Sequence, residues 1–348
     1  MNRANVVTDS ALEHALEYAL DQHEADQIAA IADRVRALGE APVDAGFYDR
    51  CWQLRDDLPA GLRWFLENFR RTEPAAFCLV HGFPVDDQAV GPTPRDWRAA
   101  SPSGAIARIE VFIALCGATL GDPFAWSSLQ AGRMIQDIVP IRGDEHRQNG
   151  HGSEAPLEFH TEDGFHPLRC DYLLLFGVRN RDEVPTIVSS VRDLRLATEH
   201  VEVLAEPRFN ILPDAEHVRQ LEGTSPGHPA LLRMKQLRDE PEPSAVLFGD
   251  PAAPYIRIDL PFMRCVGDDP AAERALAALL AALDAAKRDV VVGQGTLLVV
   301  DNYVGIHGRR AFTPRYDGTD RWLKKLTVSR NLRQSLGFHA TTSARVIF

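Results

Sequence analysis

Hydrophobic residues recur at helical spacing through the first part of the chain. Between residues 10 and 38 they stand about three or four positions apart among Glu, Asp and Arg, which is typical of an amphipathic helix. These apolar positions are Leu12, Leu16, Leu20, Ile28, Ile31 and Val35. Ser10 suits the N-cap of this helix, and similar patterns predict helices at residues 61–70, 105–115 and 271–287. The N-terminal part is therefore predicted to be a helical layer that packs on the rest of the molecule and carries no chemistry.

Short apolar or alternating runs follow, most of them after residue 132. Strands are predicted at residues 76–81, 133–140, 171–178, 185–191, 245–249, 255–260, 295–300 and 322–329. Residues 142–155 are polar and Gly-containing, so we expect a surface loop there. Many short strands bracketed by helices predict a mainly β fold with flanking helices, either a sandwich or a jelly roll with an added helical layer. We expect a single domain over residues 1–348, with a helical buttress at about 1–75 and a jelly-roll core at about 76–335.

Composition narrows the functional classes. The formal charge of −11 argues against a nucleic-acid partner, because phosphate binding relies on clustered Lys and Arg. No apolar run approaches the roughly 20 residues that cross a bilayer, and the N-terminus lacks the hydrophobic stretch of a signal peptide, so a cytoplasmic protein is expected. The five cysteines are scattered and form no Cys-x-x-Cys pair, which indicates neither a disulfide framework nor a zinc site.

The strongest chemical signal is the pair His160-Thr-Glu162 followed far downstream by His307. Two imidazoles and one carboxylate form the ligand set that leaves half of an octahedral Fe(II) site open. In a strand, residues i and i+2 point to the same side, so His160 and Glu162 are expected to grip one ion together. A His-x-Glu tripeptide alone is most often a chance surface feature. His307 follows an apolar run predicted to be a buried strand, and supplies the third candidate ligand.

Two motifs carry a resemblance to a known family. They are His160-Thr-Glu-Asp-Gly-Phe-His-Pro-Leu-Arg-Cys-Asp-Tyr-Leu-Leu-Leu-Phe and His307-Gly-Arg-Arg-Ala-Phe-Thr-Pro-Arg-Tyr-Asp-Gly-Thr-Asp-Arg321. They resemble the clavaminate-synthase-like (TauD-type) Fe(II)/2-oxoglutarate-dependent oxygenases, most of all the hydroxylases of free arginine, lysine and asparagine. The resemblance implies a double-stranded β-helix core, bound Fe(II), and 2-oxoglutarate and O2 as co-substrates.

The resemblance also implies roles for individual residues. Arg321, fourteen residues after the distal histidine as in the family, would hold the distal carboxylate of 2-oxoglutarate, since its planar fork matches a carboxylate. Thr186 would add a hydroxyl bond to the same carboxylate, although a Thr in a strand can simply reflect β propensity. Other basic residues cluster around Arg321 in the sequence and suggest a pocket for small carboxylates, with a solvated face as the alternative. They are Arg309, Arg310, Arg315, Lys324 and Lys325.

Substrate contacts follow from the same resemblance. Gln130 and Glu162 would receive the α-ammonium group, and Lys325 stands where relatives often have an Arg for the substrate carboxylate. Asp259 matches the acidic position that reads the side-chain nitrogen, unless it is a turn residue capping its own backbone. Arginine and some lysine hydroxylases have a second Asp two residues later, where this chain has Pro261. Ser153, in the loop at residues 142–155, is expected either to line the pocket or to face solvent.

The expected function is hydroxylation of an unactivated side-chain carbon of a free L-α-amino acid, with L-arginine as the first candidate and release of succinate and CO2. Hydroxylation of L-lysine or L-asparagine, and desaturation of the same substrate, are the alternatives among enzymes. A sensor that binds 2-oxoglutarate and metal without turnover is the alternative outside them. Glu162 favours hydroxylation or desaturation over halogenation, because halogenating relatives lack this carboxylate. A free amino acid is the expected partner, and the oligomeric state is not predicted.

Overall fold

The computed structural model describes residues 16–100, 102–339 and 344–347. Its α-helices are α1 (Gln22–Ala37), α2 (Ala45–Arg50), α3 (Ala60–Thr72), α4 (Asp87–Val90), α5 (Gly104–Leu120), α6 (Thr198–Leu204), α7 (Ala215–Thr224), α8 (Pro229–Asp239) and α9 (Pro270–Ala286). Its strands are β1 (Leu16–Ala19), β2 (Phe77–His81), β3 (Asp122–Trp126), β4 (Gln136–Ile138), β5 (Leu157–His160), β6 (Tyr172–Arg179), β7 (Thr186–Ser190), β8 (Phe209–Ile211), β9 (Leu247–Asp250), β10 (Ala253–Ile256), β11 (Met263–Cys265), β12 (Arg288–Val290), β13 (Leu297–Asp301), β14 (Gly305–Arg309), β15 (Trp322–Ser329) and β16 (Val346–Ile347).

Two sheets form the centre of the molecule. The larger has the order β1-β2-β13-β6-β15-β3-β16, with β4 also paired to β15, and the smaller has the order β12-β7-β14-β5. Antiparallel pairs join β13, β6 and β15 in the larger sheet and all four strands of the smaller one. Two further pairs, β10-β9 and β11-β8, stand apart from these sheets. The result is a mixed, sheet-rich fold with helices.

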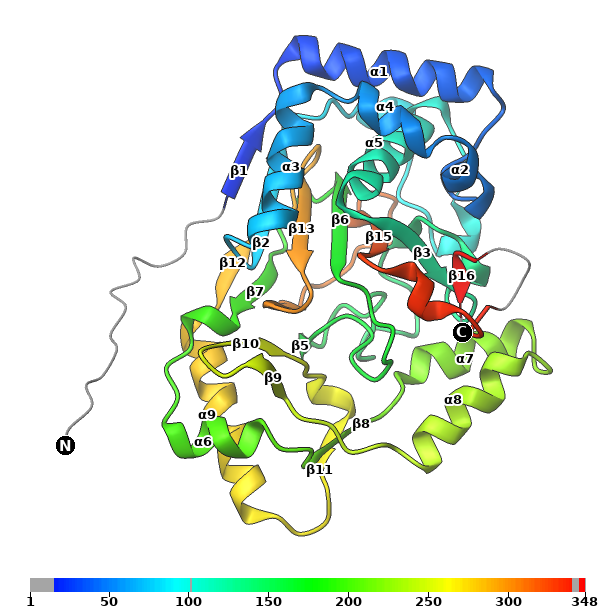
Figure 1. Cartoon of the computed structure of the whole chain (residues 1–348). Coiled ribbons are helices and arrows are strands. Elements are labelled where there is room, and N and C mark those ends of the chain that lie inside the picture. The colour runs from blue at the N-terminus through cyan, green and yellow to red at the C-terminus, as the bar shows by residue number, and fades with distance from the viewer. Residues whose placement is uncertain (1–15, 101, 340–343, 348) are drawn as a thin grey trace.

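Alternate residues of the central strands enter different cores. On β6, Leu174 and Phe176 pack with the N-terminal helices, whereas Leu173 and Leu175 face the smaller sheet. Successive side chains of a strand point to opposite faces, so a strand covered on both sides appears in the sequence as an unbroken apolar run. The helical layer of α1, α3 and α5 covers the first face, as Figure 1 shows. The space between the two sheets is where the cavity of the candidate site opens.

Helix α5 anchors the helical layer. Ser103 caps its N-terminus, and nearly every residue from Ile109 to Leu120 is buried. It packs against α1 and α3 on one side and against β15 on the other. An all-round apolar helix of this kind is stable only in the interior. The predicted helices at residues 61–70, 105–115 and 271–287 correspond to α3, α5 and α9; α3 and α5 are longer than predicted, and α9 lies one residue earlier.

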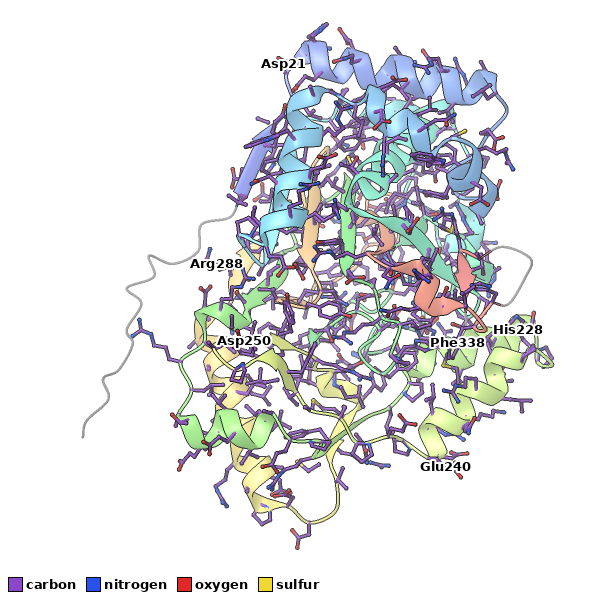
Figure 2. The ribbon with its side chains drawn as sticks, in the orientation of Figure 1. Asp21, His228, Glu240, Asp250, Arg288 and Phe338 are labelled. Carbon is purple, nitrogen blue, oxygen red and sulfur yellow. The ribbon has the colours of Figure 1, made fainter. Side chains whose placement is uncertain are left out.

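The predicted helix at residues 10–38 is wrong at its N-terminal end. Leu16 and Leu20 fit the helical spacing, but residues 16–19 form β1, which pairs in parallel with β2. The helix begins only after Asp21, labelled in Figure 2, whose side chain accepts from the backbone N–H of Glu24 while the Glu24 side chain accepts from the N–H of Asp21. This capping box sets the start of α1, and the free edge of β2 draws the preceding residues into the sheet. The predicted N-cap Ser10 and Leu12 lie outside the described residues.

Two other expectations need correction. The loop at residues 142–155 has no helix or strand, as predicted, but Asp144, Asn149, His151 and Ser153 in it are buried. Polar side chains can be buried here because their atoms bond to one another and to neighbouring elements. The sequence pattern also missed α6, α7 and α8, and Figure 2 marks the two ends of α8 with His228 and Glu240.

Candidate metal centre and substrate cavity

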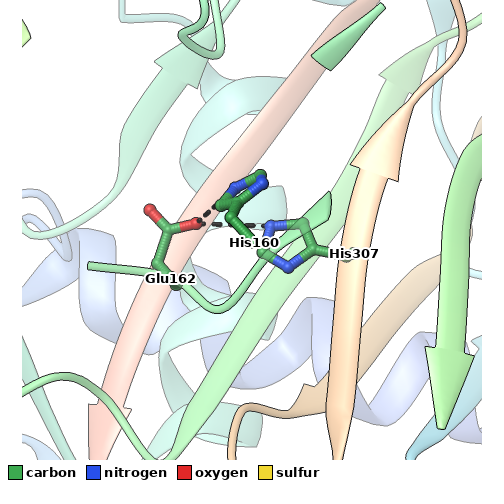
Figure 3. Close-up of side chains that lie close together, drawn as sticks. All are labelled: His160, Glu162 and His307. Atoms are coloured by element: carbon green, nitrogen blue, oxygen red, sulfur yellow. Dashed lines mark ion pairs between the residues drawn. The ribbon is translucent and has the colours of Figure 1, made fainter. Parts of the chain in front are cut away.

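The three candidate metal ligands come from two neighbouring strands of the smaller sheet. His160 is the last residue of β5, and His307 is the middle residue of β14 and pairs directly with it. We expected Glu162 to share a strand with His160, but Glu162 lies in the turn after β5. The chain turns back at this point, and the turn brings the carboxylate alongside both imidazoles, as shown in Figure 3.

The donor atoms converge on one point. Glu162 Oε2 lies 3.9 Å from His160 Nε2 and 3.4 Å from His307 Nε2, and one ligand atom of each residue lies within 4.8 Å of the others. His160 Nδ1 lies 2.9 Å from the carbonyl of Glu158, which it can reach only as a donor. This bond leaves the Nε2 lone pair free for a metal, the usual second contact of a ligating histidine. Two imidazoles and a carboxylate on one side of an ion suit Fe(II) with open positions.

The charges of His160 and Glu162 suit metal binding. Burial and the adjacent His307 lower the pKa of His160 to about 3, which keeps its imidazole neutral. Burial alone would raise the pKa of Glu162, but Lys325 and the two histidines outweigh it and hold that pKa well below the usual range. The site therefore offers a neutral nitrogen on His160 and an ionised carboxylate on Glu162, the protonation states that a metal requires.

Asn302, which the sequence analysis did not single out, holds the backbone of Glu162. Its Oδ1 accepts from the Glu162 N–H at 2.7 Å, and its Nδ2 donates to the Glu162 carbonyl at 3.1 Å and to that of Cys170 at 2.9 Å. Asn302 is completely buried in the turn between β13 and β14. The sequence signal was an Asp-Asn pair just after an apolar strand, which alone indicates only a turn.

A buried cationic position lies beside the metal ligands. Arg321, just before β15, donates to Thr186 Oγ1 on β7 at 3.3 Å, and its Nε has no hydrogen-bond partner. Burial and the neighbouring Arg309 lower the pKa of Arg321 to about 9. Within the described part of the chain Arg321 forms no ion pair, so its guanidinium lacks the anion that would offset its burial. A carboxylate-bearing ligand such as 2-oxoglutarate fits this position.

The basic cluster around Arg321 divides into two groups. Arg310 pairs with Asp289 and Arg315 with Asp182 on the surface, and Lys324 is buried between Glu110 and Asp137. Arg310 and Arg315 thus belong to a solvated face, and Lys324 belongs to a buried structural network of charges. Arg309, Arg321 and Lys325 instead line the same cavity as His160 and His307.

Lys325 and Gln130 line this cavity but already have partners. Lys325 Nζ lies 2.6 Å from Glu162 Oε1, on the side of the carboxylate away from the histidines. Burial would lower the pKa of Lys325, but the charge of Glu162 and the hydrogen bond to it raise the value above its usual range. The Gln130 amide group donates to the Asp137 carbonyl at 2.8 Å and accepts from the Asp137 N–H at 3.0 Å. To bind substrate as predicted, Lys325 and Gln130 must therefore share these hydrogen bonds with the substrate or exchange them for bonds to it.

Asp259 is the acid of the cavity that lacks a partner. It is 5% exposed, its side chain makes no capping bond to the short helix that follows, and no described cation lies within ion-pair distance. Burial raises the pKa of Asp259 well above its usual range, and the charges of Asp214, Asp163 and Glu162 raise it further. The alternative of a turn cap thus finds no support, and the carboxylate faces a cavity that also carries Pro261.

The remaining predicted residue lies behind the cavity wall. Ser153 is completely buried, and its carbonyl accepts from the Phe312 N–H at 2.9 Å, but it is not among the residues that line the cavity. The loop reaches the cavity instead through Gln148, Asn149, Gly150 and His151. Sequence analysis missed Asp214, Glu216 and His217, which also line it from the start of α7. Their segment showed no motif that would have indicated a site.

Comparisons with known proteins agree with this geometry. No family model matches the chain. The chain is 39% identical to the L-ornithine/L-arginine 3-hydroxylase of Catenulispora acidiphila, with 84% of this chain and 87% of that protein covered. It is 30% identical to clavaminate synthase 2 of Streptomyces clavuligerus, with 87% and 89% covered. The structure of the non-heme iron oxygenase OrfP in complex with Fe, succinate and (3S)-hydroxy-L-Arg superposes with a TM-score of 0.89 at 36% identity, over 95% of this chain and 99% of OrfP.

These similarities extend over most of the chain. The chain belongs to the clavaminate-synthase-like branch of the Fe(II)/2-oxoglutarate-dependent oxygenases.

Proposed function

We propose that the chain is an Fe(II)- and 2-oxoglutarate-dependent hydroxylase of a free L-α-amino acid with a cationic side chain, and that L-arginine is its first substrate. The observation that carries this proposal is Asp259, an acid that is buried without an ionic partner among the described residues, in the cavity that His160, Glu162 and His307 line. A buried carboxylate is costly unless a cation neutralises it. The ornithine/arginine hydroxylase and the hydroxyarginine complex of OrfP support a cationic substrate.

The chain's own residues would bind and orient the reactants. His160, Glu162 and His307 would hold Fe(II), and Arg321 with Thr186 would bind the distal carboxylate of 2-oxoglutarate. With dioxygen, these bound groups supply the oxidant that removes a hydrogen from an unactivated carbon, and succinate and CO2 are released. The task of the protein is then to place one C–H bond near the metal and to exclude water.

The substrate would be held at both ends. Glu162 and Gln130 would receive its α-ammonium group and Lys325 its carboxylate, while Asp259 would pair with the side-chain cation. A Lys keeps the charge of the Arg found in relatives but loses its two-pronged grip. With Pro261 two residues after Asp259, the guanidinium would meet one acid at this turn, so a compact ammonium such as that of lysine or ornithine is the second candidate.

We further propose that the two facing sheets are a double-stranded β-helix, or jelly roll, in a single domain. Residues 1–75 would buttress a core of about residues 76–335. The packing of α1, α3 and α5 on the larger sheet supports this division, because these helices bury the face that does not carry the cavity. In the described residues no helix has the length and apolar character needed to span a membrane.

Coupled turnover tests the proposal. Succinate release is measured with Fe(II), 2-oxoglutarate and a panel of arginine, lysine, ornithine, asparagine, glutamine and citrulline, for the wild type and for Asp259→Asn. We expect arginine to be turned over, and the variant to lose about 100-fold or more on cationic substrates but much less on neutral ones, because a buried charge pair is broken. His160→Ala should abolish succinate release.

Two results would contradict the proposal. If Asp259→Asn keeps the wild-type ranking and rates, the residue does not read the side chain. A sensor would bind 2-oxoglutarate and metal yet release no succinate with any amino acid of the panel.

A further inference from the structure

His217, on α7, contacts the peptide segment that follows the metal ligand Glu162. Its Nε2 lies 3.0 Å from Asp163 Oδ1, and its Nδ1 lies 2.6 Å from Ser128 Oγ. The side chains of His217 and Asp163 are 1% and 5% exposed. Because an ionised carboxylate only accepts, Nε2 carries the proton and donates to Asp163, and Nδ1 accepts from the Ser128 hydroxyl. The imidazole is therefore fixed at both nitrogens.

Asp163 needs such support because of its backbone. Its φ of 52° lies in the left-handed region, which residues other than glycine seldom adopt. The Trp126 indole N–H donates to its second carboxylate oxygen, and the turn closes with a bond from the Gly164 N–H to the Thr161 carbonyl at 3.1 Å. Residues held in such a conformation persist only where their surroundings fix them. Asn302 holds the backbone of Glu162, one residue earlier, and the two side chains that hold Asp163 fix the turn directly after it.

Helix α7 also covers the cavity. Glu216, His217 and Gln220 line it, and the Asn149 amide of the loop at residues 142–155 donates to Glu216 at 2.9 Å. Gln220 Oε1 accepts from the Gln130 N–H at 2.6 Å. One short helix thus contacts the loop over the substrate, the residue predicted to bind its ammonium group, and the segment beside the metal ligand.

We propose that His217 is a positioning residue: by holding Asp163 it fixes Glu162 at the metal site, from a helix that also lines the cavity proposed for the substrate. The occupant of that cavity rests on the function proposed above, whereas the effect on metal binding does not. Contacts outside the ligand shell orient the ligands themselves, and their loss weakens metal binding without removing a ligand.

Metal affinity tests this role without turnover. Co(II) binding by calorimetry is compared for the wild type, His217→Leu and His217→Gln. We expect His217→Leu to bind about 10-fold more weakly, as for other contacts outside the ligand shell. In His217→Gln the amide nitrogen can still donate to Asp163, so this variant should recover most of the affinity. With Fe(II) and substrate, His217→Leu should release more succinate per hydroxylated amino acid than the wild type.

Arg219→Gln is the matched control on the same helix. Arg219 Nη2 donates to Asp144 at 2.8 Å and to Glu216 at 2.7 Å, so its loss loosens α7 from the loop without touching Asp163. This variant should retain wild-type Co(II) affinity. Equal weakening by Arg219→Gln and His217→Leu would overturn the proposal, because the effect would then come from α7 as a whole. A folded His217→Leu with unchanged affinity would overturn it as well.

A second variant tests the proposal if His217→Leu fails to fold. Ser128→Ala removes the contact at Nδ1 and leaves the imidazole in place, and we expect about 3-fold weaker Co(II) binding. Unchanged affinity in Ser128→Ala would then refute the proposal. A wild-type chain that binds Co(II) but releases no succinate with any amino acid would instead refute the proposed function.

Discussion

Arg321 and Asp259 are buried in one cavity, and within the described residues neither has an ionic partner. A buried guanidinium calls for a carboxylate, and a buried acid whose pKa is raised by burial ionises most readily when a cation binds beside it. The sequence motif identified Arg321 by its spacing from His307, and the structure adds that, among the described residues, its guanidinium is bonded to Thr186 alone. The sequence could not predict that Lys325 pairs with Glu162 or that Asn302 bonds to the Glu162 backbone, because both contacts depend on turns that join distant segments.

Arg321→Ala should raise the KM for 2-oxoglutarate by about 10-fold to 1000-fold, because the distal carboxylate loses a charge-assisted partner. The KM for the amino acid should change by no more than a few fold. Arg310→Ala is the control from the same segment, since Arg310 pairs with Asp289 on the surface and does not line the cavity. Steady-state kinetics in both substrates checks this, and equal changes in the two KM values would count against the assignment.

Asp301 provides a test of pH dependence away from the metal. Burial raises the pKa of this carboxyl to about 7, from an ordinary value near 3.8. The folded state therefore binds the proton more tightly than the unfolded chain, and this contribution to stability is present below pH 3.8 and lost as the pH rises to about 7. Asp301→Asn removes the titration and keeps an acceptor for the Tyr303 N–H, which lies 3.0 Å from Oδ1.

The free energy of unfolding of Asp301→Asn, relative to the wild type, should therefore increase by up to ~1.4 kcal/mol per pH unit between about pH 4 and 7 and then level off. Urea denaturation at several pH values measures it. Asp250→Asn is the matched control, because Asp250, labelled in Figure 2, accepts from the backbone N–H of Ala252 in the same way at an exposed turn. A difference that does not vary with pH for Asp301→Asn would contradict the assigned burial effect.

At the scale of elements, the sequence pattern succeeded where an element is buried on a continuous face. The predicted strand at residues 322–329 coincides with β15, and α5 and α9 lie where their apolar runs predict. It failed for α7 and α8, whose apolar positions are few and pack in small clusters around Leu221 and Met234. α7 is held largely by polar contacts to other segments, which leave no periodic signal in the sequence, whereas α8 packs through a few apolar positions.

The loop at residues 142–155 should become protected when substrate binds. Arg309 donates to the carbonyls of Gly152 and Ala155, and the Tyr316 hydroxyl donates to Glu145, so both ends are tied while Asn149 and its neighbours face the cavity. Added contacts from an amino acid should slow amide hydrogen exchange of residues 148–151 by about 10-fold or more. Exchange is measured with Co(II) and 2-oxoglutarate, with and without arginine, and α5, which does not line the cavity, is the internal reference. Equal exchange of the loop in both states would exclude its closing role.

At the scale of the whole molecule, the two sheets assemble the site from segments that are far apart in the chain. The larger sheet supplies Leu173, Leu175 and Lys325, the smaller one supplies Thr186 and His307, and the segments that cover the opening complete the wall. The class of fold followed from alternating apolar runs, while the pairing of β5 with β14 is a long-range contact that no local pattern encodes. The family resemblance identified the metal ligands, which no local pattern brings together, and the structure identified the residues that hold them in place.

Oxygen incorporation into arginine tests the central claim most directly. The purified chain is incubated with Fe(II), 2-oxoglutarate and L-arginine under 18O2, and the amino acid is analysed by mass spectrometry. A hydroxylase gives a product heavier than arginine by about 18 mass units, in a near one-to-one ratio with succinate, because one atom of dioxygen enters each product. A product lighter by about 2 mass units would reveal desaturation, and unchanged arginine without succinate would contradict the assignment of the chain as an arginine hydroxylase.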